Sequence, residues 1–174
     1  MKKYLWLSFT AATLASCTTI PSTPPFEPTT TFNASDVAWS RGVGPNTVDG
    51  NALLRTRGGD VRTCAGEEVF LIADSAYARE RITYLYAGAL DRGFNYSRPI
   101  ADGPLAYKES HRRTTCDAQG DFSFRDIPDG TYYVTTRVVW EAPGQYALSS
   151  QGGALMHRVE LTGGETANIV LTAN

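Results

Sequence analysis

Net charge is almost absent from this sequence, and histidine is rare. The 174 residues carry 16 basic and 18 acidic side chains, which gives a formal net charge of −2. A charge this small creates no strong field to gather nucleic acid, so we expect no nucleic-acid partner. The two histidines, His111 and His157, lie far apart in the sequence. Because metal ligands usually come in closer clusters, we interpret both as ordinary strand residues and expect neither a metal nor another cofactor.

Familiar catalytic motifs are missing as well. The sequence has no Gly-x-Ser-x-Gly turn of a serine hydrolase, no His-Glu-x-x-His of a zinc peptidase and no Walker-type phosphate loop. We therefore expect a protein that is not an enzyme.

No hydrophobic run is long enough to cross a membrane as a helix. The apolar run from Tyr4 to Leu14 follows two lysines and precedes small residues and a cysteine. Since a membrane-spanning helix needs about 20 apolar residues, this layout is typical of a secretory signal peptide, which we place at residues 1–16.

The four residues from Leu14 to Cys17 resemble the lipoprotein box of bacteria. The resemblance implies that Cys17 is acylated and becomes the new N-terminus, and two or more acyl chains hold a protein stably on a bilayer. An Asp after the cysteine tends to retain such proteins at the inner membrane, whereas here the residue is Thr18. We expect a lipid-anchored envelope protein at the outer membrane, facing the periplasm. The alternative is a plain signal peptide with a cysteine near its cleavage site.

Residues 17–47 are rich in Thr and Pro and keep no helical or strand period. Proline fixes φ and cannot donate a backbone hydrogen bond, which favours an extended, solvated chain. We predict a tether over this interval, with Phe32, Val37 and Trp39 docking on the domain near its end.

Residues 48–174 alternate short runs of Val, Tyr, Phe and Thr with clusters of Gly, Asp and Pro. Such spacing is typical of a β-sandwich. We predict one mainly β domain with strands near 48–56, 67–73, 105–115, 120–125, 131–141, 154–161 and 166–172. Residues 74–104 form an insertion with one short helix, which Ser75 or Asp74 is suited to cap. This helix either covers an edge of a sheet or forms a recognition surface.

The stretch "CDAQGDFSFRDIPDGTYYV" at 116–134 has the densest pattern in the chain. Alternate residues of a strand face opposite sides, so Phe122 and Phe124 share one face. On the next strand the same period predicts an inward set and an outward set. The inward set is Tyr132, Val134, Val138 and Trp140, and the outward set is Tyr133, Thr135, Arg137 and Val139. Pro and Gly in "IPDG" indicate a turn between the strands.

This stretch resembles the signature of carboxypeptidase regulatory-like domains, which have a seven-stranded transthyretin-like (prealbumin-like) sandwich. "VDGNALLRTRGG" and "CAGEEVFLI" resemble the first two strands of that family, whereas the insertion 74–104 is unmatched. The resemblance implies a fold and says little about function, because such domains are attached to many unrelated proteins.

Two enzyme families have a similar sandwich. Intradiol dioxygenases bind iron partly through a His-x-His pair, which this chain lacks. Hydroxyisourate hydrolases end in Tyr-Arg-Gly-Ser, whereas this chain ends in "NIVLTAN". A hydrolase or dioxygenase-like enzyme is therefore the weaker alternative.

Two cysteines remain once Cys17 carries lipid. Exported proteins meet an oxidising compartment, so we predict a disulfide between Cys64 and Cys116 that encloses the insertion. The alternative is a reactive thiol or a metal ligand, for which neither cysteine has a Cys-x-x-Cys or Cys-His neighbour.

The stretch "RTRGGDVR" at 55–62 is the remaining candidate site. Its arginines, Arg55, Arg57 and Arg62, flank glycines that allow a backbone to approach an anion. In the alternative interpretation they pair with the nearby Asp60, Glu67 or Glu68.

Two functional hypotheses follow. The first is a non-enzymatic domain that binds or scaffolds another envelope component. The second is a domain that binds a small molecule or glycan at the arginine loop or at the tyrosine-rich insertion. The sequence does not indicate the oligomeric state.

Overall fold

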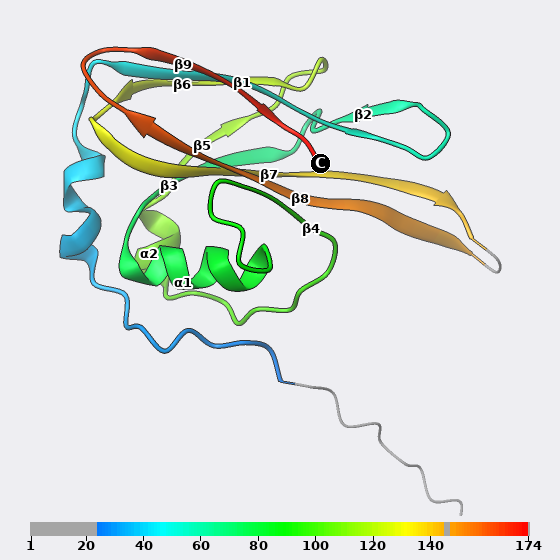
Figure 1. The fold of residues 1–174 in the computed structure, drawn as a ribbon, viewed down its shortest axis with the longest axis horizontal. Helices are drawn as coiled ribbons and strands as arrows, with labels where there is room; N and C mark the ends of the chain where they lie inside the picture. The colour runs from blue at the N-terminus through cyan, green and yellow to red at the C-terminus, as the bar shows by residue number, and fades with distance from the viewer. Residues whose placement is uncertain (1–23, 145–146, 174) are drawn as a thin grey trace, which may run out of the picture.

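The computed structural model describes residues 24–144 and 147–173 and folds them into two packed β-sheets (Figure 1). One sheet contains β1 (Asn46–Arg55), β2 (Val61–Thr63), β6 (Asp121–Ile127) and β9 (Thr166–Leu171). The other contains, in spatial order, β4 (Arg92–Asn95), β8 (Leu148–Leu161), β7 (Gly130–Pro143), β3 (Glu68–Ala73) and β5 (Arg112–Thr115). The expected mainly β sandwich is confirmed, although the described residues form nine strands instead of seven.

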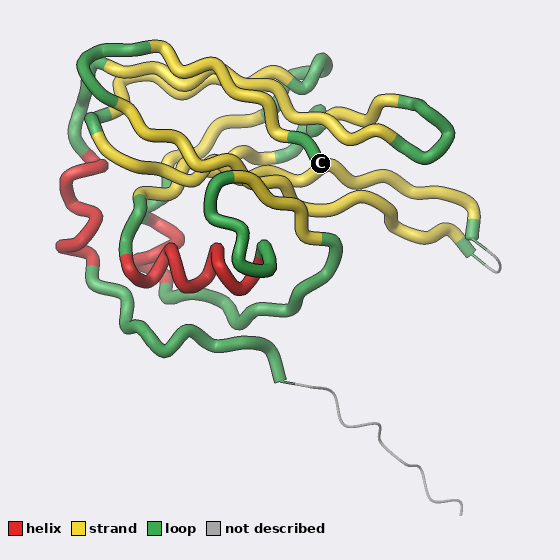
Figure 2. The backbone as a smooth tube through the Cα atoms, viewed as in Figure 1, coloured by secondary structure: helices red, strands yellow, loops and turns green. Residues whose placement is uncertain are grey.

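Two hairpins, one short and one long, shape one end of the sandwich. Strand β1 lies between β6, which is antiparallel to it, and β9, which is parallel; beyond them it continues into the hairpin with β2. Strands β7 and β8 pair along their full lengths, from Gly130 opposite Leu161 to Pro143 opposite Leu148. Both hairpins therefore project past the common body of the two sheets (Figure 2).

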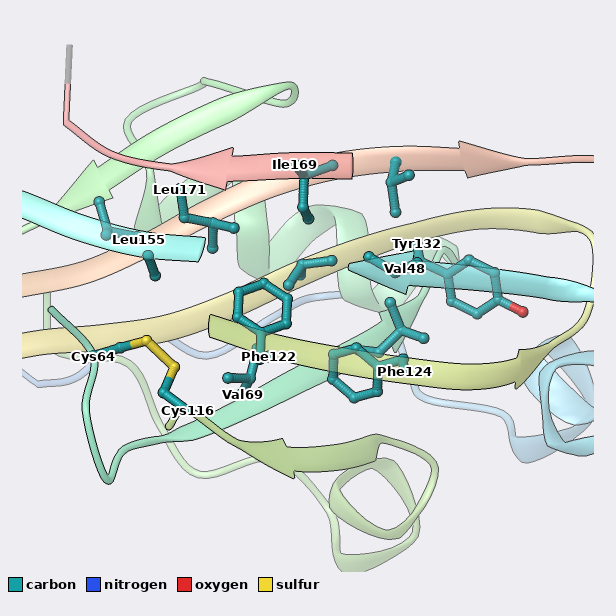
Figure 3. Packing of buried hydrophobic residues seen from close by; sticks show 14 of the residues in the cluster. Val48, Cys64, Val69, Cys116, Phe122, Phe124, Tyr132, Leu155, Ile169 and Leu171 are labelled. Atoms are coloured by element: carbon teal, nitrogen blue, oxygen red, sulfur yellow. A yellow bond between two sulfur atoms is a disulfide. The ribbon is translucent and has the colours of Figure 1, made fainter. Parts of the chain in front are cut away.

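The main core fills the space between the sheets (Figure 3). Phe122 and Phe124 of β6 are 6% and 4% exposed, as the alternating pattern predicts. Tyr132 and Val134 of β7 pack into the same cluster. The turn before β6 also forms as expected, because the side chain of Asp117 accepts hydrogen bonds from the backbone N–H groups of Gln119 and Asp121.

The predicted strand 105–115 is wrong in its first half. Residues Leu105–Glu109 form a short helix, α2, and only Arg112–Thr115 are extended. Pro104, with φ of −53°, precedes a run of good helix formers. The helix buries Tyr107, whose ring meets that of Tyr77 at a centroid distance of 4.8 Å. Packing of this tyrosine therefore stabilises a helix where the local sequence pattern predicted a strand.

The insertion covers a face of the five-stranded sheet instead of an edge. Its helix α1 (Ala76–Leu85) is capped by Ser75, whose hydroxyl accepts a hydrogen bond from the N–H of Ala78 at 3.1 Å. Beneath it lies a second apolar cluster to which β3, β7 and β8 contribute Ile72, Tyr133 and Met156. Tyr133 lies on the face opposite Tyr132, as the strand period predicts, but it is only 1% exposed because the insertion covers that face; the expectation that this face meets solvent is wrong.

A strained residue follows the C-cap of helix α1. Ala87 has a φ of +56°, and the N–H of Gly88 bonds back to the carbonyl of Thr83 at 2.8 Å. This left-handed terminus normally takes glycine, because a Cβ there costs about 1 kcal/mol.

An Ala87→Gly variant is therefore expected to be more stable than the wild type by about 1 kcal/mol. Urea denaturation followed by far-UV circular dichroism measures the difference. Ala76→Gly, the same change in the right-handed first turn of α1, is the control and is expected to destabilise the protein. A loss of stability in both variants would contradict the prediction.

The interval 17–47, expected to be a tether, is not one over its described part. Residues Ala34–Arg41 form a 3-10 helix, η1, that buries Val37 in the main core. Trp39 contacts Tyr132 at a centroid distance of 5.3 Å, and Phe32 packs on the second cluster. The predicted docking of these three residues is confirmed. Their burial keeps the segment against the domain despite its prolines.

Glu80 of α1 fastens the earlier part of this segment. Its carboxylate accepts hydrogen bonds from the N–H groups of Thr29 and Thr30 at 2.7 and 2.8 Å. Hydrogen bonds from Thr30 and Thr29 lower the pKa of Glu80 to about 2. Beside them, the ring of Phe26 stacks on Tyr84 at 4.0 Å.

Because the pKa of Glu80 is depressed by folding, its contribution is present above the ordinary pKa of a glutamate, about 4.5, and is lost as the pH falls toward 2. We expect the amide protons of Thr29 and Thr30 to be protected at pH 6 and to lose protection first near pH 2. Hydrogen exchange observed by NMR measures this. Glu80→Gln should remove the protection already at pH 6, whereas equal exchange in both proteins would contradict the role of the carboxylate.

The predicted disulfide is present. Cys64 follows β2 and Cys116 follows β5, and their Cα atoms lie 5.7 Å apart. Both cysteines are buried in the main core (Figure 3). Cys17 and the proposed signal peptide lie outside the described residues. Within residues 24–144 and 147–173, no helix has the length and apolar character needed to cross a membrane.

Candidate functional site

A cleft of about 570 Å³ lies between the two projecting hairpins. Its lining residues come from the β1–β2 hairpin and from the outer half of β7–β8. Figure 1 shows that these two hairpins project from the same end of the sandwich. The residues that carry its chemistry come from three separate parts of the chain and are Arg55, Arg57, Phe94, Tyr96, Trp140 and Gln151.

The arginine wall is built on a tight turn. The N–H of Thr56 bonds to the carbonyl of Asp60 at 2.8 Å, and the hydroxyl of Thr56 accepts the N–H of Asp60. Gly59 has a φ of +95°, a conformation that favours glycine. This closed turn presents Arg55 and Arg57, both exposed, at the cleft.

The third predicted arginine lies elsewhere. Arg62 of β2 does not line the cleft, and its guanidinium pairs with the carboxylate of Asp60 at 3.9 Å. The predicted arginine site is therefore divided. Arg55 and Arg57 line the cleft, whereas Arg62 forms a solvated ion pair, as the alternative interpretation predicted.

Three aromatic residues form the apolar part of the cleft. Trp140 of β7 packs against the main core on one side and lines the cleft on the other. Phe94 of β4 and Tyr96 just after it are 40% and 63% exposed. The hydroxyl of Tyr96 donates a hydrogen bond to the carbonyl of Ser150 at 3.4 Å. Large aromatic side chains are thus held at the surface in fixed positions.

Two glycines of β8 allow these aromatic rings to approach the strand. Gly152 has a φ of +89°, and a Cβ there would overlap the carbonyl oxygen of Val138 and come within 2.8 Å of the Trp140 ring. A Cβ on Gly153 would lie 3.0 Å from the Phe94 ring. The shape of the aromatic wall therefore depends on glycine at both positions.

A smaller hollow of about 330 Å³ adjoins the cleft and shares Tyr96 and Gly152 with it. Arg98 and Ser150 are among its lining residues. Together the two hollows provide aromatic faces, guanidinium groups and short polar side chains along the end of the β7–β8 hairpin. Such a lining suits a polar, cyclic ligand with negative charge, because ring faces contact aromatic planes while guanidinium groups bind anions.

The sequence located only part of this site. The arginine loop and the insertion were separate candidates, and the pairing of β4 with β8 brings residues of both to one cleft. Trp140 was expected only as a core residue. Phe94 and Tyr96 were missed, and the only signal for them was two aromatic residues in a stretch without helical spacing.

The histidines lie away from the cleft. His157 is on β8, and His111 precedes β5, which is separated from β8 by two strands or about 14 Å. Burial lowers the pKa of both, to about 4 for His111, with smaller contributions from nearby arginines. Glu160 lies three positions after His157 on β8, so the two side chains face opposite sides of the sheet. The described residues contain no group of three or more His, Cys, Asp or Glu side chains suited to a metal ion.

Comparisons with known proteins bear mainly on the fold. No family model matches the sequence. No curated protein matches it either. A solved structure from Pseudomonas aeruginosa, described as "a putative carbohydrate binding protein", superposes with a TM-score of 0.66 and 23% sequence identity. The match covers 82% of this chain and 97% of that chain. At this identity the likeness shows a shared fold and no more.

Proposed function

We propose that the protein is a carbohydrate-binding domain that recognises an anionic glycan of the cell envelope in the cleft between the two hairpins. The observation that carries this proposal is the meeting of exposed Phe94 and Tyr96, and of Trp140, with Arg55 and Arg57.

Sugar rings suit this arrangement. A sugar ring has an apolar face of C–H groups and a polar rim of hydroxyl groups, so it can stack on an aromatic plane while its rim binds polar side chains. Exposed aromatic side chains gathered in one hollow commonly mark a binding surface, because folding alone does not require them there. The guanidinium groups of Arg55 and Arg57 can bind a carboxylate, sulfate or phosphate on the same glycan.

The description of the structural neighbour supports the same function. It favours glycan binding over the scaffolding role that we placed first from the sequence.

The cellular setting belongs to the same proposal. Acylation of Cys17 would anchor the protein at the outer membrane, facing the periplasm, where anionic glycans are available. We also propose that the sandwich is of the transthyretin-like, carboxypeptidase regulatory-like type. Its support is the signature at 114–134. The two aromatic residues of this signature on β6, Phe122 and Phe124, are buried as the signature predicts.

A glycan array followed by calorimetry of the purified full-length protein tests the function. Tyr96→Ala is expected to weaken binding of the best glycan about tenfold, since truncation of an aromatic contact at the centre of an interface commonly costs over 1 kcal/mol. Leu105→Ala on α2, also a strongly exposed apolar residue, is the control and should bind as the wild type does. Absence of any glycan hit, or equal binding by Tyr96→Ala, would reject the proposal.

A further inference from the structure

A second hollow, which we call the insertion hollow, lies between helices α1 and α2 and the face of the sheet that they cover. Its volume is about 570 Å³. Strand β3 contributes Phe70, α1 contributes Arg81 and Leu85, and His111 lies immediately before β5. None of these residues belongs to the cleft between the hairpins, so the insertion hollow is a separate place on the molecule.

Arg81 is a half-buried cation in this hollow without a carboxylate partner among the described residues. Its guanidinium donates to the carbonyl of Ala101 at 2.9 Å and lies over the rings of Tyr77 and Tyr107, 5.7 and 5.5 Å from their centroids. These contacts fix its position but leave its charge uncompensated. A partly desolvated cation of this kind binds an anion more strongly than a solvated one does.

His111 adds a polar atom that has no protein partner. Its Nε2 is buried and forms no hydrogen bond to any described residue. Its ring is held edge-on by Tyr107 at 4.4 Å and by Phe70 at 6.1 Å. The residue lines the insertion hollow, although its unpaired Nε2 is itself buried from solvent. Burial lowers the pKa of His111 to about 4, so the ring is neutral at pH 7.

The other lining residues indicate which apolar groups and how much charge a ligand of this hollow can carry. Phe70, Ile82 and Leu85 provide an apolar surface. Glu67, Glu68 and the exposed Arg137 also line the hollow, and the two carboxylates disfavour negative charge beyond the one group that Arg81 can bind. The hollow therefore favours a ligand with an apolar ring and a single anionic group.

We propose that the insertion hollow binds a small cyclic monocarboxylate, with its carboxylate on Arg81 and its ring against Phe70, close to the ring of His111. This proposal does not depend on glycan binding, because it uses a different set of residues.

Benzoate is a suitable probe, and benzamide, which has the same ring without the charge, is the matched control ligand. The NMR signals of the two histidine rings in the full-length protein provide the readout at pH 7. Benzoate is expected to shift the signals of His111 in a saturable manner and to leave those of His157 on β8 unchanged, while benzamide binds at least tenfold more weakly. Equal shifts of both rings, equal binding of benzamide, or no saturable shift would overturn the proposal.

Arg81→Gln should weaken benzoate binding at least tenfold, and Arg125→Gln on β6 of the other sheet should not. Since Arg81 also packs on two tyrosines, its loss can disturb the insertion; Arg81→Lys keeps a cation there and is expected to bind benzoate more tightly than Arg81→Gln. Benzoate binding that is unaffected by Arg81→Gln, or that is weakened equally by Arg125→Gln, would overturn the assignment of the carboxylate to Arg81. Tyr96→Ala should leave benzoate binding intact, so that failure of glycan binding and failure of this site are distinguished.

Discussion

A Cys64→Ala/Cys116→Ala double variant is expected to unfold with a free energy about 4 kcal/mol below that of the wild type. The cysteines are 52 positions apart, and the loop they close contains β3, the whole insertion, α2 and β5. In the chain-entropy account, opening a loop of this length restores conformational freedom to the unfolded chain and so favours unfolding. Both side chains are also buried in the main core, where smaller alanines pack less well.

Urea denaturation with and without a reducing agent measures this effect. The wild type should lose most of the difference when the disulfide is reduced, and the double variant should not respond to the reductant. The insertion should loosen first, because it lies within the loop that the bridge closes between the end of β2 and the end of β5. If the two proteins differed by less than about 1 kcal/mol in free energy of unfolding, the bridge would add little to the packing that already keeps the loop closed.

The strands that form the core were predictable because their alternating patterns are strong. Phe122 and Phe124 on β6, and Tyr132 and Val134 on β7, point inward as their spacing requires. Strands β2 and β4 were not predicted. They are short, with bounds Val61–Thr63 and Arg92–Asn95, and each forms only by pairing with a neighbouring strand, which a local pattern cannot show.

The second core shows why the sequence period alone could not predict that the face of β7 carrying Tyr133 is buried. The outward set on β7 was expected to meet solvent, and Tyr133 in that set is buried under α1. A period of two separates the faces of a strand but does not say what covers each one. The covering element lies in the insertion, and its position depends on long-range packing with the tyrosine cluster.

The candidate site was predictable only in its charged half. A glycine-flanked group of arginines is visible in the sequence, whereas the aromatic half requires β4 to be paired with β8. That pairing places Phe94 and Tyr96 beside Trp140 although they are more than 40 positions apart in the chain. The same geometry separates Arg62 from Arg55 and Arg57, although all three are within eight positions, "RTRGGDVR".

This separation allows a sharp test of anionic recognition, because the arginine turn contains its own control. Arg55→Gln/Arg57→Gln is expected to weaken binding of an acidic glycan about 30-fold, since each guanidinium can form a charge-assisted hydrogen bond with a carboxylate or sulfate. Arg62→Gln removes a cation from the same hairpin without altering the cleft and should change the affinity less than twofold at 150 mM salt, where charges beyond about 8 Å are largely screened. Calorimetry with an acidic glycan and its neutral counterpart measures both effects.

The neutral glycan separates charge recognition from stacking. It is expected to bind the wild type and Arg55→Gln/Arg57→Gln with similar affinity, because its contacts are with the rings of Phe94, Tyr96 and Trp140. Tyr96→Ala should weaken both glycans by a similar factor. If Arg62→Gln weakened acidic glycan binding as much as the double variant does, the effect would come from the general charge of the hairpin, and the cleft would lose its role as the anion site. If the double variant weakened both glycans equally, the arginines would act by shaping the turn instead of by binding the anion.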